Sequence, residues 1–136
     1  MAKTDPDRAA QAVLKALSFD EAGLVPAIVQ QHDTGEVLMV AWMNADAIRE
    51  TLRSGQVVYW SRSRKALWRK GETSGQTQAL KDFRIDCDGD VILLLVDQKG
   101  VACHTGRRTC FFRALHGDDL EIIKNVEVDP AKLYES

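Results

Sequence analysis

The chain has 136 residues, of which 45% are hydrophobic and 28% are charged, with a formal net charge of −2. This length and composition suit one ordinary globular domain over residues 1–136, and the weak charge gives no general attraction to nucleic acid or to an anionic membrane. The odd number of cysteines, with neither an export signal nor a run of about 20 apolar residues, predicts a cytoplasmic protein.

The first part of the sequence predicts two helices around a β-hairpin. Apolar residues recur at helical spacing over residues 7–17, which indicates an amphipathic helix. Two apolar and β-branched runs, 24–31 and 37–42, flank the turn sequence His-Asp-Thr-Gly and predict a hairpin. Asn44 then stands where the N-cap of a helix over residues 45–53 is expected, and Ser-Gly ends that helix.

The rest of the chain predicts mainly strands. Runs 56–60, 78–85 and 91–96 each have strand character, and we expect another strand over residues 109–114 and a short apolar run over 120–128. The connections are too short for repeated helical crossovers, so the sheet should be mostly antiparallel. The expected fold class is α+β with few helices.

Residues 59–75 combine five basic residues with two tryptophans in an otherwise mildly acidic chain. Arg62, Arg64 and Lys70 can pair with phosphate oxygens, and the backbone N–H groups of residues 71–75 can form a nest for an anion. Trp60 or Trp68 can stack on a purine. The alternative is a basic surface loop whose tryptophans are anchored in the core. No P-loop motif is present, so ATP hydrolysis has no support.

Three aspartates, Asp86, Asp88 and Asp90, occupy alternate positions in the sequence D-C-D-G-D. If this segment is extended, the three carboxylates leave one face of the strand and Cys87 leaves the other. Carboxylates this close repel one another unless water or a cation screens them, and a hard cation such as Mg²⁺ is the natural partner. The alternative is a solvated acidic turn around Gly89. The motif lacks the glycine and the glutamate of an EF-hand calcium loop.

The three cysteines, Cys87, Cys103 and Cys110, are separated by fifteen and then six residues. This spacing is neither the C-x-x-C of a zinc knuckle nor an even disulfide framework. Three thiolates supply three of the four ligands that zinc prefers, and an open fourth position is typical of catalytic zinc. Three buried reduced thiols are the alternative, but His104 and the Gly-Arg-Arg after it argue against purely apolar surroundings. A metal beside a basic, aromatic loop suggests hydrolysis of a phosphorylated, nucleotide-like molecule.

Five segments of residues 24–115 resemble the phosphoribosyl-AMP cyclohydrolase family, whose members open the adenine ring of phosphoribosyl-AMP in histidine biosynthesis. These segments are V-L-M-V-A-W-M-N, Y-W-S-R-S-R, L-W-R-K-G-E-T-S-G, D-C-D-G-D and C-H-T-G-R-R-T-C-F-F-R. They stand in the family's order. Relatives often carry a fused pyrophosphohydrolase domain after this region, and we expect this chain to be the monofunctional form.

The resemblance implies a set of metal ligands and an assembly. Cys87, Cys103 and Cys110 would bind Zn²⁺, and Asp86, Asp88 and Asp90 would bind Mg²⁺. The family forms intertwined homodimers whose zinc sites draw cysteines from both subunits, which would account for the unusual spacing. The implied product is the carboxamide ribonucleotide ProFAR.

The reaction can then be written as a hypothesis. Water activated by zinc attacks C6 of the purine, and N1 leaves as the ring opens. His104 is our first choice for the general base, ahead of His116 and His32. The residues expected to bind substrate are Arg62, Ser63, Arg64, Trp68, Lys70, Gly71, Thr73, Ser74, Gly75, Arg107 and Arg108.

Two other functions remain open. A zinc-dependent purine nucleotide deaminase would attack the same carbon, but it normally carries H-x-E and P-C-x-x-C motifs, which are absent from this sequence. Release of ammonia would distinguish it, because ring opening releases none. A nucleic-acid-binding module using residues 59–70 is the other alternative, and the net charge of −2 argues against it.

Overall fold

The computed structural model describes residues 5–133 and begins with helix α1, Pro6–Ala16. The Asp5 carboxylate caps α1 by accepting a hydrogen bond from the N–H of Asp7 at 3.0 Å. The second helix, α2 (Ala45–Ser54), begins at Asn44, whose side chain accepts from the N–H of Ala47 at 2.8 Å. It ends at Gly55, which has a φ of +76° and closes the last turn onto Thr51. Both predicted helices are confirmed, including the Asn44 cap.

The main sheet has four strands in the order β2-β1-β6-β5: β1 is Val25–Gln31, β2 Val37–Met43, β5 Gln78–Ile85 and β6 Ile92–Gln98. Two of its pairings, β1 with β2 and β5 with β6, are antiparallel hairpins. The central pair, β1 and β6, is parallel, because the chain between them travels through β2, α2 and β5. The prediction of a mostly antiparallel α+β fold is confirmed, with this one parallel pair added.

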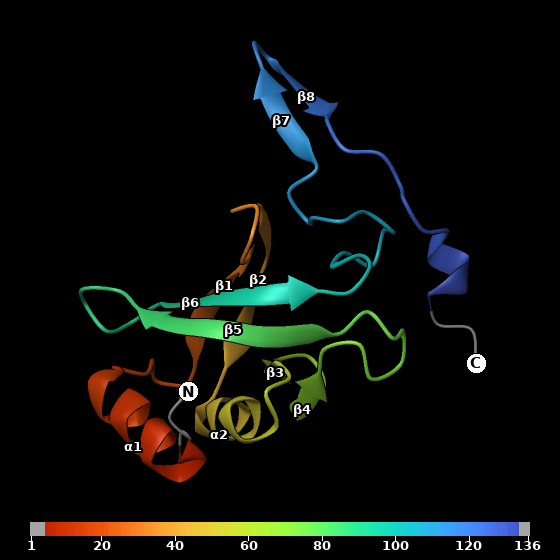
Figure 1. Ribbon diagram of the computed structural model, residues 1–136. Helices are drawn as coiled ribbons and strands as arrows, with labels where there is room; N and C mark the ends of the chain where they lie inside the picture. Colours follow the sequence, from red (N-terminus) through yellow and green to blue (C-terminus); the bar gives the residue numbers. More distant parts are fainter. Residues whose placement is uncertain (1–4, 134–136) are drawn as a thin grey trace.

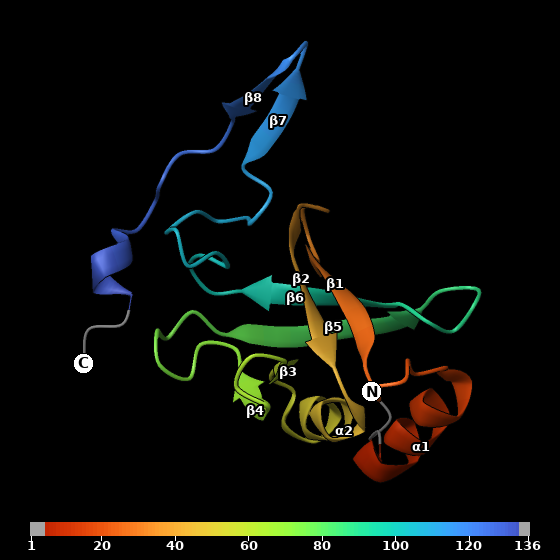
Figure 2. The ribbon, with the colours of Figure 1, turned by 180° about the vertical axis from the view of Figure 1, so that it is seen from behind.

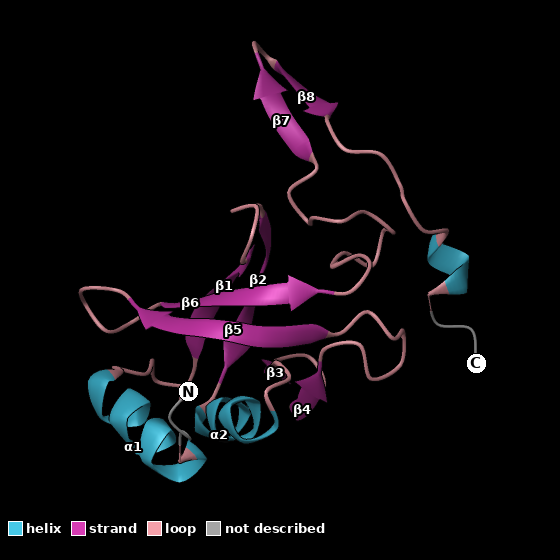
Figure 3. Cartoon of the chain, in the orientation of Figure 1, coloured by secondary structure: helices cyan, strands magenta, loops and turns pink. Residues whose placement is uncertain are grey.

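Both helices lie on the same side of the sheet, as Figures 1 and 3 show. Alternate residues of the strands point to that side and form the core, with Ala27, Val29 and Leu94 fully buried. On the opposite side, Ile28 pairs with Val40 and with Leu93 in the sheet register. Val40 is 48% exposed. This apolar face of the sheet has no helix over it in the described residues.

A short second sheet pairs β3 (Val58–Ser61) with β4 (Ala66–Arg69). The prediction of a strand over 56–60 is confirmed for its second half, and Gln56 makes only an isolated bridge to Ala79. β4 lies inside the stretch that we expected to be a basic loop. Its sequence, A-L-W-R, has only three consecutive apolar residues and lies among basic residues, so the sequence pattern does not predict a strand there.

The predicted strand over 109–114 is wrong for most of its length. Thr109 and Cys110 bond to the β2 backbone, with the Cys110 N–H donating to the Leu38 carbonyl at 2.7 Å. The strand β7 is Arg113–His116, and it pairs with β8, Asp119–Ile122, within the predicted apolar run. This β7–β8 hairpin stands away from the main sheet in both Figure 1 and Figure 2. The described chain ends after a 3₁₀ turn, η1, Pro130–Lys132.

No helix within residues 5–133 is long and apolar enough to cross a membrane.

Candidate metal and nucleotide site

Two of the three cysteines lie in the irregular segment that follows β6, residues 99–112, which we call the cysteine loop. Its first half folds back on its second half: the Ala102 N–H donates to the Arg108 carbonyl at 3.0 Å, and the Cys103 N–H donates to the Arg107 carbonyl at 3.1 Å. The turn closes at Gly106, whose φ is +84°. This folding brings the Cys103 side chain back towards Cys110.

The Cys103 and Cys110 side chains lie close together, near enough for Cys103 to influence the ionisation of Cys110. Cys110 is exposed as a residue, but partial burial of its thiol raises the pKa of that thiol to about 12; the neighbouring Cys103 adds to this shift and Lys70 opposes it. The Thr105 hydroxyl lies 3.0 Å from the Cys103 sulfur and donates to it. Sequence reasoning did not single out Thr105, and nothing in its type or spacing marks it. Two adjacent thiols can contribute two of the sulfur ligands that zinc prefers.

Cys87 lies elsewhere, exposed in the β5–β6 turn. The cysteine loop leaves the opposite end of β6, and a seven-residue strand spans roughly 20 Å. Within one chain, therefore, Cys87 does not join Cys103 and Cys110.

The aspartate segment is a turn, so the assumption of an extended segment is wrong. Gly89 has a φ of +73°, and the Asp86 carboxylate accepts the N–H groups of Asp90 and Val91 at 3.0 and 3.1 Å. These bonds fold the segment over its own side chain, as Asp commonly does in turns. The turn nevertheless gathers the three carboxylates: Asp86, Asp88 and Asp90 each offer an oxygen, all within 4.8 Å of one another.

The charges of this cluster act on one another. Hydrogen bonding to Asp86, with partial desolvation and the charges of Asp86 and Asp88, raises the pKa of Asp90. Desolvation opposes ionisation of Asp86 as well, but the backbone N–H groups that its carboxylate accepts lower its pKa overall. All three side chains are exposed. Three such oxygens are ligands of the kind that Mg²⁺ takes.

Five of the predicted substrate-binding residues line one cavity of about 200 Å³ beside the β3–β4 hairpin. They are Arg64, Trp68, Gly71, Thr73 and Ser74. Gly71 has a φ of +84°, and a Cβ there would lie 2.6 Å from backbone atoms of Gln76 and Thr77. Gly75 donates its N–H to the Gly71 carbonyl at 2.8 Å and closes the turn.

Lys70 connects this cavity to the cysteine loop. Its side chain is buried, the ammonium donates to the Ala102 carbonyl at 2.8 Å, and it lies 5.3 Å from the Trp68 ring centroid. Burial lowers the Lys70 pKa, whereas Cys110 and Cys103 oppose that shift.

The remaining predicted basic residues lie outside the cavity. Arg62 stacks over Trp42, 4.5 Å from its ring centroid; sequence reasoning missed this contact because Trp42 was considered only as part of a predicted strand. The Ser63 hydroxyl lies 3.4 Å from that of Ser61 in the β3–β4 turn. Arg107 donates to the Lys124 carbonyl at 2.9 Å.

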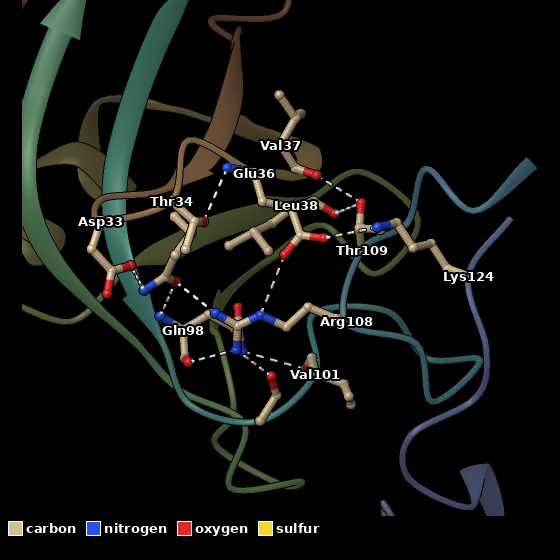
Figure 4. Close-up of polar contacts among 12 residues, drawn as sticks. Asp33, Thr34, Glu36, Val37, Leu38, Gln98, Val101, Arg108, Thr109 and Lys124 are labelled. Carbon is tan, nitrogen blue, oxygen red and sulfur yellow. Dashed lines mark hydrogen bonds and ion pairs between the residues drawn. The ribbon is translucent and has the colours of Figure 1, made fainter. Parts of the chain in front are cut away.

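Arg108, one of the residues expected to bind substrate, donates to the Gln98 carbonyl (Figure 4) and to the Gln31 side chain, at the ends of β6 and β1.

The candidate base His104 is exposed at the turn of the cysteine loop, directly after Cys103. The other two histidines belong to other elements. His116 is in the β7–β8 hairpin, where its Nδ1 lies 2.7 Å from a Glu121 oxygen. His32 follows β1, and its backbone N–H donates to the Val96 carbonyl.

Comparison with known proteins finds one family model, described as phosphoribosyl-AMP cyclohydrolase, that matches residues 39–112. A Rhodospirillum centenum protein of that name is 66% identical over 91% of this chain and 93% of its own length. Proteins of the same name from Paramagnetospirillum magneticum and Alkalilimnicola ehrlichii are 66% and 63% identical, each over 90% of this chain and over 93% and 87% of their own lengths. Every predicted site residue lies inside the matched range.

Proposed function

Because the chain belongs to the phosphoribosyl-AMP cyclohydrolase family and is therefore an enzyme that hydrolyses a cyclic amidine, we propose that it breaks the N1–C6 bond of phosphoribosyl-AMP to give ProFAR, using zinc-activated water. The observation that carries the zinc assignment is the proximity of Cys103 and Cys110 inside the matched region. Their thiols are the soft ligands that zinc selects.

We assign zinc binding to Cys103 and Cys110 of one subunit together with Cys87 of a second copy. Bound by three thiolates, zinc would supply a Lewis acid with one position open to water, whose pKa it lowers towards neutrality. The carboxylates of Asp86, Asp88 and Asp90 form the hard-oxygen set that we assign to Mg²⁺, and their mutual repulsion would be relieved by a cation.

The substrate itself makes the ring open to attack. A phosphoribosyl group on N1 leaves the adenine ring cationic, so C6 is electrophilic and N1 is a competent leaving group. Water adds to C6, the N1–C6 bond breaks, and N1 takes up a proton. Exposed at the turn next to Cys103, His104 can accept the proton of water and pass it towards N1.

We assign substrate binding to the cavity beside the β3–β4 hairpin and to the residues next to that cavity. Arg64 can pair with a phosphate, and the Trp68 ring can stack on the purine. Lys70 lies between this cavity and the thiol pair, so we expect it to hold the substrate against the reacting centre. The full proposed set includes Arg62, Ser63, Gly71, Thr73, Ser74 and Gly75.

A homodimer with shared zinc sites fits the exposed apolar surface of one chain. Leu115, Leu120 and Ile122 of the β7–β8 hairpin are 66%, 64% and 63% exposed. An isolated two-stranded hairpin is at best marginally stable in water, so a partner is expected to cover it. The uncovered sheet face around Ile28 and Val40 offers further apolar area.

The experiment compares zinc-loaded and chelator-stripped protein with phosphoribosyl-AMP as substrate, following ring opening by absorbance and assaying ammonia in parallel. We expect zinc-dependent ring opening with no ammonia. Ammonia released in step with turnover would indicate the deaminase reaction instead, and turnover by folded, fully stripped protein would contradict the zinc assignment.

A further inference from the structure

The guanidinium of Arg108 makes three hydrogen bonds within its own chain. Nη1 donates to the carbonyls of Gln98 at 2.9 Å and Gly100 at 2.7 Å, and Nη2 donates to the Gln31 side-chain oxygen at 2.9 Å. Glu36 lies 3.6 Å from Nε. Figure 4 shows the side chain pointing inwards, towards Gln98 and Glu36. Charge-assisted bonds to two carbonyls and a side-chain amide occupy much of the donor fork that a phosphate would need.

The residues that Arg108 binds, Gln31 and Gln98, are themselves held by several hydrogen bonds. Gln31 and Gln98 are the last residues of the parallel strands β1 and β6, and each is only 4% exposed. The Gln31 oxygen also accepts the Gln98 backbone N–H at 2.9 Å, and its amide nitrogen donates to Asp33 and Asp97. Since both strands belong to the main sheet, Gln31 and Gln98 cannot shift without breaking buried hydrogen bonds.

Arg108 lies between Cys103 and Cys110 in the sequence, and its backbone and its neighbours fix both parts of the cysteine loop. Its carbonyl accepts the N–H of Ala102, the residue before Cys103, at 3.0 Å. Two residues after Arg108, the Cys110 N–H donates to Leu38 in β2, and the Thr109 hydroxyl donates to the Val37 carbonyl at 2.7 Å. The cysteine loop has no helix or strand of its own over residues 99–112. Its tertiary bonds must therefore set the distance between the thiols.

We propose that Arg108 is a positioning residue that clamps the cysteine loop to the ends of β1 and β6 and so preorganises Cys103 and Cys110 for zinc. The inference rests on the proposed zinc site. In this proposal Arg108 acts through the cysteine loop and not by binding substrate phosphate. Residues that orient metal ligands contribute strongly to metal affinity.

The test measures zinc affinity by competition with a chromophoric chelator and records the thiolate bands of the cobalt-substituted protein. For Arg108→Gln we expect zinc to bind about 10- to 100-fold more weakly, with altered cobalt bands. Arg108→Lys keeps the charge and part of the bonding, so its loss should be smaller. At saturating zinc, kcat should fall while KM for phosphoribosyl-AMP changes little.

Two further variants separate positioning from other effects. Gln31→Met keeps the side-chain volume but removes the acceptor of Arg108, so we expect weaker zinc binding from a residue that touches neither thiol. Arg49→Gln is the matched control: this arginine is 57% exposed and paired on the surface of α2, and zinc affinity should not change.

The outcomes distinguish this inference from the proposed function. Unchanged zinc affinity in Arg108→Gln and Gln31→Met, with KM raised at least about 10-fold in the former, would overturn the clamp and return Arg108 to phosphate binding. If Arg108→Gln fails to fold, the zinc affinities of Arg108→Lys and Gln31→Met test the clamp in its place. Failure of the proposed zinc site itself would give a different result: Cys103→Ser would bind zinc as tightly as the wild-type protein.

Discussion

The thiol of Cys103 is the single group whose loss should matter most. Its sulfur lies close to Cys110 and accepts a hydrogen bond from the Thr105 hydroxyl, so a serine there keeps the shape but removes a zinc ligand. We expect Cys103→Ser to lose stoichiometric zinc and to retain less than about 1% of the wild-type rate. Metal analysis and steady-state kinetics check this. A variant that bound as much zinc and turned over at the full rate would show that the metal assignment is wrong.

Gly106 carries a second prediction, about how the C-terminal segment supports the cysteine loop. Its φ is +84°, and a Cβ would lie 1.9 Å from the Val128 carbonyl oxygen. The N–H groups of Glu127 and Val128 both donate to the Gly106 carbonyl. An alanine in the left-handed conformation costs about 1–2 kcal/mol of unfolding free energy. Gly106→Ala should cost more than this, because residues 127–128 must also move away from the new Cβ.

Gly117 provides the control for that measurement. It also has a positive φ, +62°, but nothing lies within 4 Å of the Cβ position. In urea denaturation, Gly117→Ala should lower the free energy of unfolding by only the conformational cost of a left-handed alanine, about 1–2 kcal/mol. Equal losses in the two variants would mean that the contact between Gly106 and residues 127–128 does not contribute to stability.

Single residues also show where sequence reasoning succeeds and where it stops. The gathering of Asp86, Asp88 and Asp90 was predicted from alternation along a strand, but the structure produces it by a turn around Gly89. The alternative weighed for that segment, an acidic turn, describes the backbone correctly. A local hydrogen bond from the Asp90 N–H to the Asp86 carboxylate decided the outcome, and spacing alone does not reveal it.

The Asn44 cap carries the clearest prediction at the level of an element. Its side chain satisfies the otherwise unpaired N–H of Ala47 at the start of α2. Replacing it with alanine should cost about 1 kcal/mol of unfolding free energy. The comparison variant is Arg49→Ala, which breaks the exposed pair with Asp46 but leaves the cap and the first-turn carboxylate in place, and it should cost less than about 0.5 kcal/mol of unfolding free energy. Equal losses by urea denaturation would contradict the capping role.

Helices and buried strands could be predicted because their residues repeat with the period of the element. α1, α2 and the four strands of the main sheet all carry such a pattern. β4 could not, since its apolar run is only three residues long and lies among basic residues. Residues 109–112 could not either, because contacts with β2, a segment about 70 positions earlier, decide their conformation. Propensity describes a neighbourhood in sequence, and the conformation of residues 109–112 depends on a distant partner, whereas β4 pairs with the nearby β3.

The whole molecule carries the prediction about association. Leu115 and Leu120 face each other across the β7–β8 hairpin and are both more than 60% exposed. We expect the double change Leu115→Glu and Leu120→Glu to shift the protein towards monomers in sedimentation and to reduce zinc content with it. Asp118→Lys alters charge in the same hairpin without removing apolar contact, so it should stay associated. A double variant that remains a zinc-loaded dimer would exclude this hairpin from the interface.

The candidate site also extends beyond what one chain can display. Sequence reasoning grouped all three cysteines, and the structure brings together Cys103 and Cys110 but leaves Cys87 at the far end of β6. No pattern within a sequence states which ligands come from which copy. The family resemblance supplied that expectation, and it stays a prediction.

Mixing two inactive variants tests the central claim, a cyclohydrolase whose zinc site is built from two copies. Cys87→Ser and Cys103→Ser are each expected to be inactive. When they are unfolded and refolded together, about half the dimers should be mixed, and each mixed dimer should have one intact site, so about one quarter of the wild-type rate of phosphoribosyl-AMP ring opening should return, with zinc. Mixed dimers that form and yet remain inactive would contradict the shared site.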